Sequence, residues 1–375
     1  MPNAKQSNFI SAFAVGTDAR ELVNLCVRDL GDISATANFG FIYASDALAN
    51  QLPRLMSLLA DATSVQQWCG TLATGIFCND LEIYDQPAIA ILLCEFSDNS
   101  WHTFAYNPEK PELAKLNDNF VPNFGVVYAD PNNLITSEVI TKAQQESTPA
   151  HLVGGLTLSQ TQPLQIAGNR IYDGVSGVLF NNSIPVLTEI TQACSPIGRF
   201  HKVTSTSNNR VVGLDKQPAL NVLIEEAGEF LSNDLERLRE YVCAGIATAE
   251  SNLGADEYLV RDLLTFDENE NAITINANIT VGDKLIFCNR DGNKAAVSLD
   301  QMLERIKQKL NGAKPRGAIY HCSASRGKHL FGSNSQELKR IQACLDNVPL
   351  IGLFTAGEIY LGQTHNHSGV LTVFL

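Results

Sequence analysis

The segment from Pro349 to Gly369 carries residue types that can do chemistry. It reads PLIGLFTAGEIYLGQTHNHSG, an apolar run that breaks on glycine and is followed by Glu358, His365 and His367. Ligands in α/β proteins bind where strands end, so a carboxylate at position 358 is suited to accept the amine of a ligand. The same carboxylate could instead cap a turn or pair with Arg326.

His365 and His367 are two residues apart, a spacing that places both side chains on one face of a strand. Such a pair can ligate a metal, and a single neutral imidazole can be an axial ligand of haem. Zinc needs further Cys, His or carboxylate ligands, and the sequence shows no second cluster with ligand spacing. We therefore predict no metal site, and either polar packing or a ligand hydrogen bond for both histidines.

A second candidate is the segment YHCSASRG, which places Cys322 and Arg326 where another predicted strand ends. A thiolate beside an imidazolium is an activated nucleophile, so Cys322 could serve a thiol hydrolase or transferase. However, His321 adjoins it and would point to the opposite face of the strand, which favours a buried, unreactive thiol. The guanidinium of Arg326 is suited to clamp a ligand carboxylate, or to pair with Glu358 or Glu337.

The bulk composition excludes several classes of function. The chain has 375 residues, 45% of them apolar and 18% charged, which suits a folded protein of two domains. The net charge of −13 disfavours binding to nucleic-acid phosphates. We expect a cytoplasmic protein with reduced thiols, since neither a membrane span nor a signal-peptide pattern is seen and the nine cysteines are scattered.

The elements that position these residues follow a repeated pattern. FGFIYAS, FGVVYAD and RGAIYHC each read as a buried strand, and a second apolar segment that reaches a glycine follows each of them. Helix-like apolar stripes lie between the two strands, as at 48–59 and 338–345. A strand, a helix and a strand normally form a parallel pair. A third strand closes each unit, at 87–96, 173–180 and 368–375.

The sequence between the second and third units is different. It contains β-rich segments up to about Leu220, then two predicted helices near 219–231 and 235–249. We place a domain boundary at Asn181, which gives domains at 1–181 and 182–375. The predicted fold class is α/β, with two associated domains whose mixed β-sheets are flanked by helices and built from repeated strand-helix-strand units.

The segment PVLTEITQACSPIGRFHKVTSTSNNRVVGLDKQPAL, with YHCSASRG, VPLIGLFTAGEI and the terminal His-x-His, resembles the FIST sensory proteins. The resemblance extends from about Asp18 to Leu375 and covers a FIST N-terminal and a FIST C-terminal domain. It implies an intracellular sensor of small ligands in signal transduction, with amino acids as proposed ligands, rather than an enzyme. Signalling would then need a separate partner such as a histidine kinase. Some family members are haem-dependent nitric oxide sensors, so haem is the alternative cofactor.

The resemblance also implies a set of site residues. The family pattern around Gln192 and Cys194 is kept, although Ala193 stands where a glycine is usual and Ser195 where an arginine is usual. We predict no catalytic residue, and a ligand-binding set that consists of Gln192, Pro196, Gly198, Cys322, Arg326, Gly327, Glu358, His365 and His367.

Overall fold

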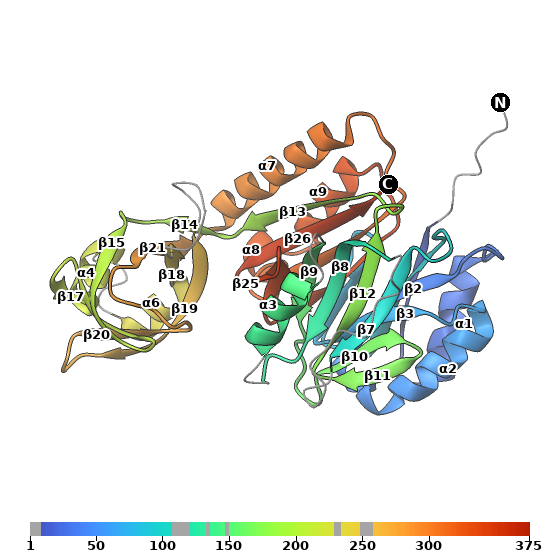
Figure 1. Ribbon diagram of the computed structural model, residues 1–375, viewed down its shortest axis with the longest axis horizontal. Helices are drawn as coiled ribbons and strands as arrows, with labels where there is room; N and C mark the ends of the chain where they lie inside the picture. Colours follow the sequence, from blue (N-terminus) through green and yellow to red (C-terminus); the bar gives the residue numbers. More distant parts are fainter. Residues whose placement is uncertain (1–8, 107–119, 133–135, 147–149, 229–233, 248–257) are drawn as a thin grey trace. The chain divides into compact units, whose positions relative to one another are not determined.

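The computed structural model describes residues 9–106, 120–132, 136–146, 150–228, 234–247 and 258–375 (Figure 1). These residues form two compact units. The large unit comprises the chain up to Thr191, then Leu299–Thr364 and Ser368–Leu375. The small unit comprises Gln192–Ser298 and His365–His367. Along the chain, the small unit therefore interrupts the large unit between its second and third strand-helix-strand segments.

Three six-stranded sheets of the large unit share one central plan. In each sheet a first strand pairs in parallel with a second strand and antiparallel with a third. The parallel pairs lie where the sequence predicts them, so this prediction and the mixed α/β class are confirmed. In the order first, second and third, the strands are β2 (Phe39–Ser45), β3 (Trp68–Ala73) and β6 (Ala88–Cys94); β8 (Pro122–Ala129), β9 (His151–Leu156) and β12 (Val175–Asn181); β22 (Gly317–Ser323), β23 (Leu350–Thr355) and β26 (Ser368–Phe374).

The strands that follow each parallel pair leave their own sheet and extend another one. The exchanged strands are β4 (Gly75–Cys78), β5 (Leu81–Tyr84), β10 (Leu164–Gly168), β11 (Arg170–Asp173), β24 (Glu358–Tyr360) and β25 (Gln363–His365). Strand β4 follows β3 but pairs with β23, β10 follows β9 but pairs with β3, and β24 follows β23 but pairs with β9. The opposite edges are β1 (Ile10–Val15), β7 (Trp101–Tyr106) and β13 (Val186–Gln192). Because of this exchange, the three sheets interlock.

The sheets of the large unit have an inner and an outer face. Their inner faces share one apolar core, to which Phe41, Val126 and Ile319 contribute. Their outer faces pack against helices, with α1 and α2 on the first sheet, α3 on the second, and α7 and α9 on the third. The predicted stripes at 48–59 and 338–345 are buried there. The helices are α1 (Ala19–Leu30), η1 (Asp46–Gln51), α2 (Leu52–Thr63), α3 (Thr136–Glu146), α7 (Gly292–Leu310), α8 (Lys328–Phe331) and α9 (Gln336–Cys344).

A polar chain crosses the inner core of the large unit. The hydroxyls of Tyr43 and Tyr128 are 2.6 Å apart, and the Tyr128 hydroxyl lies 3.0 Å from Nε2 of His321. All three side chains are fully buried. Burial lowers the pKa of His321 to about 3, because the imidazolium form cannot be solvated there. This histidine is therefore neutral at physiological pH.

The small unit is a β-barrel, and among its described residues the helices α4 and α6 pack against it. Strand β21 pairs with both β15 and β18, so that six of the described strands form a closed ring in the order β21, β15, β16, β20, β19 and β18. Its interior is apolar and includes Val203, Ala244 and Phe287. The elements are β14 (Cys194–Pro196), β15 (His201–Ser207), β16 (Arg210–Leu214), β17 (Gln217–Pro218), α4 (Ala219–Ala227), α6 (Leu235–Tyr241), β18 (Val242–Ala247), β19 (Leu259–Asp267), β20 (Ala272–Ile275) and β21 (Lys284–Arg290).

One predicted helix of this region is wrong in its second half. The helix expected over 235–249 ends at Tyr241, and the next residues form β18. Strand β18 pairs with β19 on one side and with β21 on the other, so its backbone groups bond to two neighbours. The hydrogen bonds to these two neighbouring strands stabilise β18 by more than the local sequence favours a helix. Residues 229–231 and 248–249 of the predicted helices lie outside the described residues.

Candidate functional site

Arg326 lies in the loop that follows β22 and is fully buried. Its Nε donates to Oε1 of Glu337 at 2.9 Å, and its Nη2 contacts the same oxygen. Tyr320 donates its hydroxyl to that oxygen at 2.6 Å, and the amide of Gly327 donates to Oε2 at 3.4 Å. Burial lowers the pKa of Arg326, but the Glu337 carboxylate outweighs it and raises the pKa above the ordinary value. Of the two predicted ion pairs, the one with Glu337 is present.

Cys322 belongs to the same cluster. Its Sγ lies 3.6 Å from Oε2 of Glu337 and is buried. Burial, and then the negative charge of Glu337, raise the pKa of the Cys322 thiol well above its ordinary value. His321 bonds to Tyr128 on the other face of β22, as the strand alternation predicts. These contacts favour a protonated, unreactive thiol rather than a nucleophile.

Glu358 begins β24 and is fully buried. Its Oε1 accepts from the Thr355 hydroxyl at 2.6 Å, and its Oε2 accepts from the amide and hydroxyl of Ser368 at 3.0 and 2.6 Å. Both oxygens therefore bond to the protein and link the start of β24 to the start of β26. The predicted contacts of Arg326 and Glu358 with a ligand remain predictions.

The other predicted site residues belong to the small unit. The backbone amide of Gln192 donates to the Ser298 hydroxyl at 3.2 Å, and Pro196 ends β14 opposite Cys288. At Gly198 a Cβ would come within 2.1 Å of the Glu226 carboxylate, so only glycine permits this close approach. His365 is the last residue of β25.

His367 is the centre of a charged cluster in the small unit. Its Nε2 lies 2.7 Å from Oδ1 of Asp262, and Asn366 donates Nδ2 to Oδ2 of the same carboxylate at 2.9 Å. Asp262 is directly opposite Cys243 in the β18–β19 ladder. The Cys243 sulfur, an Asp262 oxygen and a His367 nitrogen all lie within 4.8 Å of one another.

The electrostatics of this cluster are the reverse of those at Cys322. A hydrogen bond from Cys194 lowers the pKa of Cys243, burial opposes it, His367 lowers the pKa further, and the result is about 6. Burial lowers the pKa of His367, but hydrogen bonds to Asp262 and Cys243 outweigh it and raise the pKa to about 10. The cluster therefore holds a thiolate, an imidazolium and a carboxylate at neutral pH.

Sequence reasoning predicted His367 but missed Cys243 and Asp262. Position 243 lies within the predicted helix 235–249 and is expected there only to be a reduced thiol. Asp262 has no motif around it, and it lies 104 positions before Asn366, its hydrogen-bond donor. Only the pairing of β18 with β19 brings the thiol and the carboxylate together.

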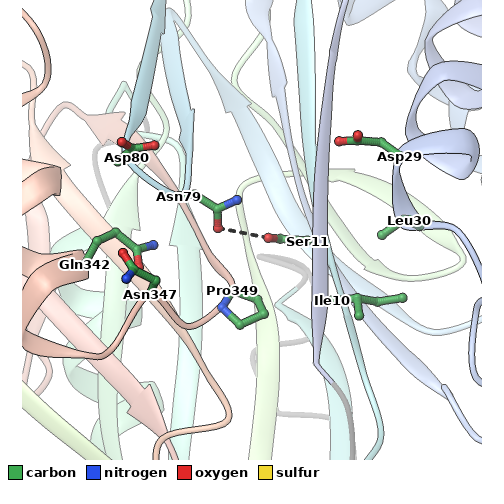
Figure 2. A pocket seen from close by; sticks show the side chains of 9 residues that line it. All are labelled: Ile10, Ser11, Asp29, Leu30, Asn79, Asp80, Gln342, Asn347 and Pro349. Atoms are coloured by element: carbon green, nitrogen blue, oxygen red, sulfur yellow. Dashed lines mark hydrogen bonds between the residues drawn. The ribbon is translucent and has the colours of Figure 1, made fainter.

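A polar pocket of about 450 Å³ lies in the large unit (Figure 2). Asp29, on α1, and Asp80, after β4, lie on either side of a 3.1 Å hydrogen bond from the Ser11 hydroxyl to Oδ1 of Asn79. That oxygen also accepts from the amide of Leu350 at 3.2 Å, which fixes the Asn79 side chain. No motif in the sequence marks this pocket, which is lined by Ile10, Ser11, Asp29, Leu30, Asn79, Asp80, Gln342, Asn347 and Pro349.

Known proteins are similar to this chain along most of its length. The FIST N domain model matches residues 38–217, and the FIST C domain model matches residues 219–361. An uncharacterized protein of Mycobacterium tuberculosis (strain CDC 1551 / Oshkosh) is 24% identical over 370 residues, covering 92% of this chain and 96% of that protein. An uncharacterized protein of Mycobacterium bovis (strain ATCC BAA-935 / AF2122/97) is 27% identical over 346 residues, covering 84% and 88%.

The protein is a two-unit α/β protein, with interlocked sheets, a barrel and a polar pocket. No helix among its described residues is long and apolar enough to cross a membrane. The chain belongs to the FIST family, as its N-terminal and C-terminal domain matches show. FIST domains are associated with sensing in signal transduction. The domain boundary predicted at Asn181 stays a prediction.

Proposed function

We propose that this FIST protein is a sensor of a small ligand that carries an amino group, such as an amino acid. The observation that carries this proposal is the pocket of Figure 2, where Asp29 and Asp80 contribute carboxylates. No lysine, arginine or histidine is among the nine residues that line the pocket. Its volume of about 450 Å³ is within the range of small-molecule sites.

The polar groups of the pocket suit an ammonium group. An ammonium presents three donors and one positive charge, and it is matched by acceptors that are negative or held in place. Asp29 and Asp80 are exposed at the pocket surface, so their carboxylates can be reached by a ligand. Asn79 is held by its bonds to Ser11 and Leu350, which lowers the ordering cost of binding.

The proposed signalling route uses a separate protein, such as a histidine kinase. Family membership supports this proposal, because FIST domains are associated with signal transduction. Ligand binding would then shift the population of a conformation that the partner recognises.

Calorimetry with a panel of amino acids and simple amines tests the pocket. We expect one class of amine to bind, and Asp29→Asn and Asp80→Asn each to weaken it at least about tenfold, because each removes a charged acceptor. Asp61→Asn, on the exposed side of α2, is the matched control and should leave the affinity unchanged. If both pocket variants bind as tightly as the wild type, the pocket is not the sensing site.

The haem alternative is tested on the same preparation. Protein expressed with a haem precursor would show a Soret band that disappears on changing His365 or His367 to alanine. Such a result, together with no binding of any amine, would replace the amine sensor by a haem-dependent gas sensor.

A further inference from the structure

Three different metal-ligating groups meet on the outer face of the small-unit barrel. They are the thiol of Cys243 on β18, the carboxylate of Asp262 on β19 and the imidazole of His367 in the segment 365–367. One ligand atom from each lies within 4.8 Å of the other two. None of these residues lines the proposed amine pocket, so this site is independent of the proposed function.

We propose that Cys243, Asp262 and His367 bind a divalent transition-metal ion of the zinc type, with a fourth coordination position left for water or a small ligand. Zinc is bound by thiolate, imidazole and carboxylate at about 2.0 to 2.3 Å, and sites that react or exchange ligands have three protein ligands. Ligand atoms in a tetrahedron of this size are about 3 to 4 Å apart. The observed cluster therefore needs only small side-chain movements.

The charges of the cluster suit a dication. His367 Nε2 and Asp262 Oδ1 lie 2.7 Å apart, at hydrogen-bond distance, and a metal ion bound by both atoms would replace the proton between them. The Cys243 thiolate and the Asp262 carboxylate would then neutralise the two positive charges of the ion. A softer ligand set of sulfur and nitrogen favours zinc over magnesium or calcium, which prefer oxygen ligands alone.

Surrounding hydrogen bonds hold Asp262 and His367 in place. Asn366 occupies Oδ2 of Asp262, so that Oδ1 faces His367. The carbonyl of His367 accepts from the amide of Ala193 at 2.9 Å, and this bond fixes a residue whose φ is +58°. Outer contacts of this kind commonly orient metal ligands and tune their affinity.

The site is closed on one side and open on the other. Cys243 is 2% exposed and the His367 side chain 8%, whereas the Asp262 side chain is 42% exposed. An ion would therefore enter beside Asp262, and the fourth position would face solvent there.

Cobalt is the probe, because Co²⁺ occupies zinc sites and a thiolate ligand gives it a charge-transfer band in the near ultraviolet. The full chain, freed of metal by a chelator and then desalted, is titrated with CoCl₂. We expect saturation at one ion per chain, and loss of the band when ZnCl₂ is added. Cys243→Ser should abolish the band and weaken binding about 100-fold or more, since a ligand is worth at least as much as an outer contact.

Two further variants keep the test decisive. Asp262→Asn, at a half-exposed position, should keep the band and weaken cobalt binding at least about tenfold. Cys288→Ala removes the thiol opposite Cys243 in the β18–β21 ladder and should bind cobalt as the wild type does. The proposal is overturned if no saturable band appears below about 1 mM cobalt, if the band survives in Cys243→Ser, or if Asp262→Asn binds unchanged.

Discussion

Each unit of this protein places a cysteine and a histidine in a buried, polar setting, with opposite results. In the large unit, Cys322 lies beside the Glu337 carboxylate and its pKa is raised, while burial lowers the pKa of His321 to about 3. In the small unit, the pKa of Cys243 falls to about 6 and that of His367 rises to about 10. Burial alone therefore does not decide the charge of these groups.

The difference lies in the partners. His321 has a neutral tyrosine hydroxyl at 3.0 Å, which cannot offset the loss of water around an imidazolium. His367 has a carboxylate at 2.7 Å, which can. The cysteines also differ in their partners, because Cys322 faces a carboxylate, whereas Cys243 accepts a hydrogen bond from Cys194 and also faces the His367 imidazolium. A hydrogen-bond donor or a partner of opposite charge reverses the effect of burial.

The largest effect is expected at the buried ion pair of the large unit. Glu337→Gln leaves the guanidinium of Arg326 without a counter-charge in a fully buried position. We expect the free energy of unfolding to fall by about 3 to 5 kcal/mol, measured by urea denaturation near neutral pH. Glu236→Gln, which breaks an exposed pair with Arg239, is the control and should cost under about 0.5 kcal/mol. Similar losses in the two variants would show that Arg326 does not depend on this carboxylate.

The next largest effect is expected in the free energy of unfolding at acid pH. The folded-state pKa of His321, about 3, is below its ordinary value of 6.5, so between these values only the unfolded chain takes up the proton. Stability linked to His321 is present above pH 6.5 and is lost as the pH falls toward 3, by at most about 1.4 kcal/mol per pH unit. His321→Gln should be less stable at neutral pH and should lose less than the wild type on acidification. An equal acid slope in both proteins would contradict a neutral, buried His321.

The thiolate and imidazolium of the small unit should nearly cancel in the pH dependence. Between pH 6.5 and 9 the folded pair holds one proton on His367, and the unfolded pair holds one on Cys243. Cys243→Ser removes the contribution of the thiol and leaves that of His367. The stability that comes from His367 is complete below pH 6.5, and in this variant it should decline as the pH rises toward 10, by at most about 1.4 kcal/mol per pH unit. Denaturation series with a chelator present would check this, and a flat profile in the variant would count against a charged His367.

The smallest effect is expected in the rates at which the two thiols, Cys243 and Cys322, are chemically labelled. Iodoacetamide reacts with thiolates, so at pH 7 we expect Cys243 to be alkylated at least about tenfold faster than Cys322. Mass spectrometry of digested, metal-free protein measures both rates in one sample. His367→Gln should slow the labelling of Cys243 and leave that of Cys322 unchanged. Equal rates for the two thiols in the wild type would remove the contrast between the two units.

Several features could be predicted because they depend on neighbours in the chain. The parallel pairs β2–β3, β8–β9 and β22–β23 follow from apolar strands that flank an amphipathic helix. The opposite orientation of His321 and Cys322 follows from strand alternation. The pairing of Arg326 with Glu337 was one of two predicted ion pairs, and only the packing of α9 beside β22 selected it.

The register of the third unit could not be predicted. Sequence similarity aligns Tyr320 with Tyr43 and Tyr128, but in the structure His321 is the residue that faces these two tyrosines. Tyr320 instead lies on the outer, helix-covered face of the third sheet and donates a hydrogen bond to Glu337. A shift of one residue on a strand moves a side chain to the other face, and packing against the other two sheets decides which face is inside.

The sequence by itself determined the family, the α/β class and the local pattern of strands and helices, because hydrophobic periodicity and short motifs act between near neighbours. Tertiary structure alone decided the exchange of β4, β10 and β24 between sheets and the meeting of Cys243, Asp262 and His367. It also assembled the pocket of Figure 2 from α1, β1, the β4–β5 turn and the end of α9. Strand pairing joins residues from separate parts of the sequence, and no local pattern specifies which edges will pair.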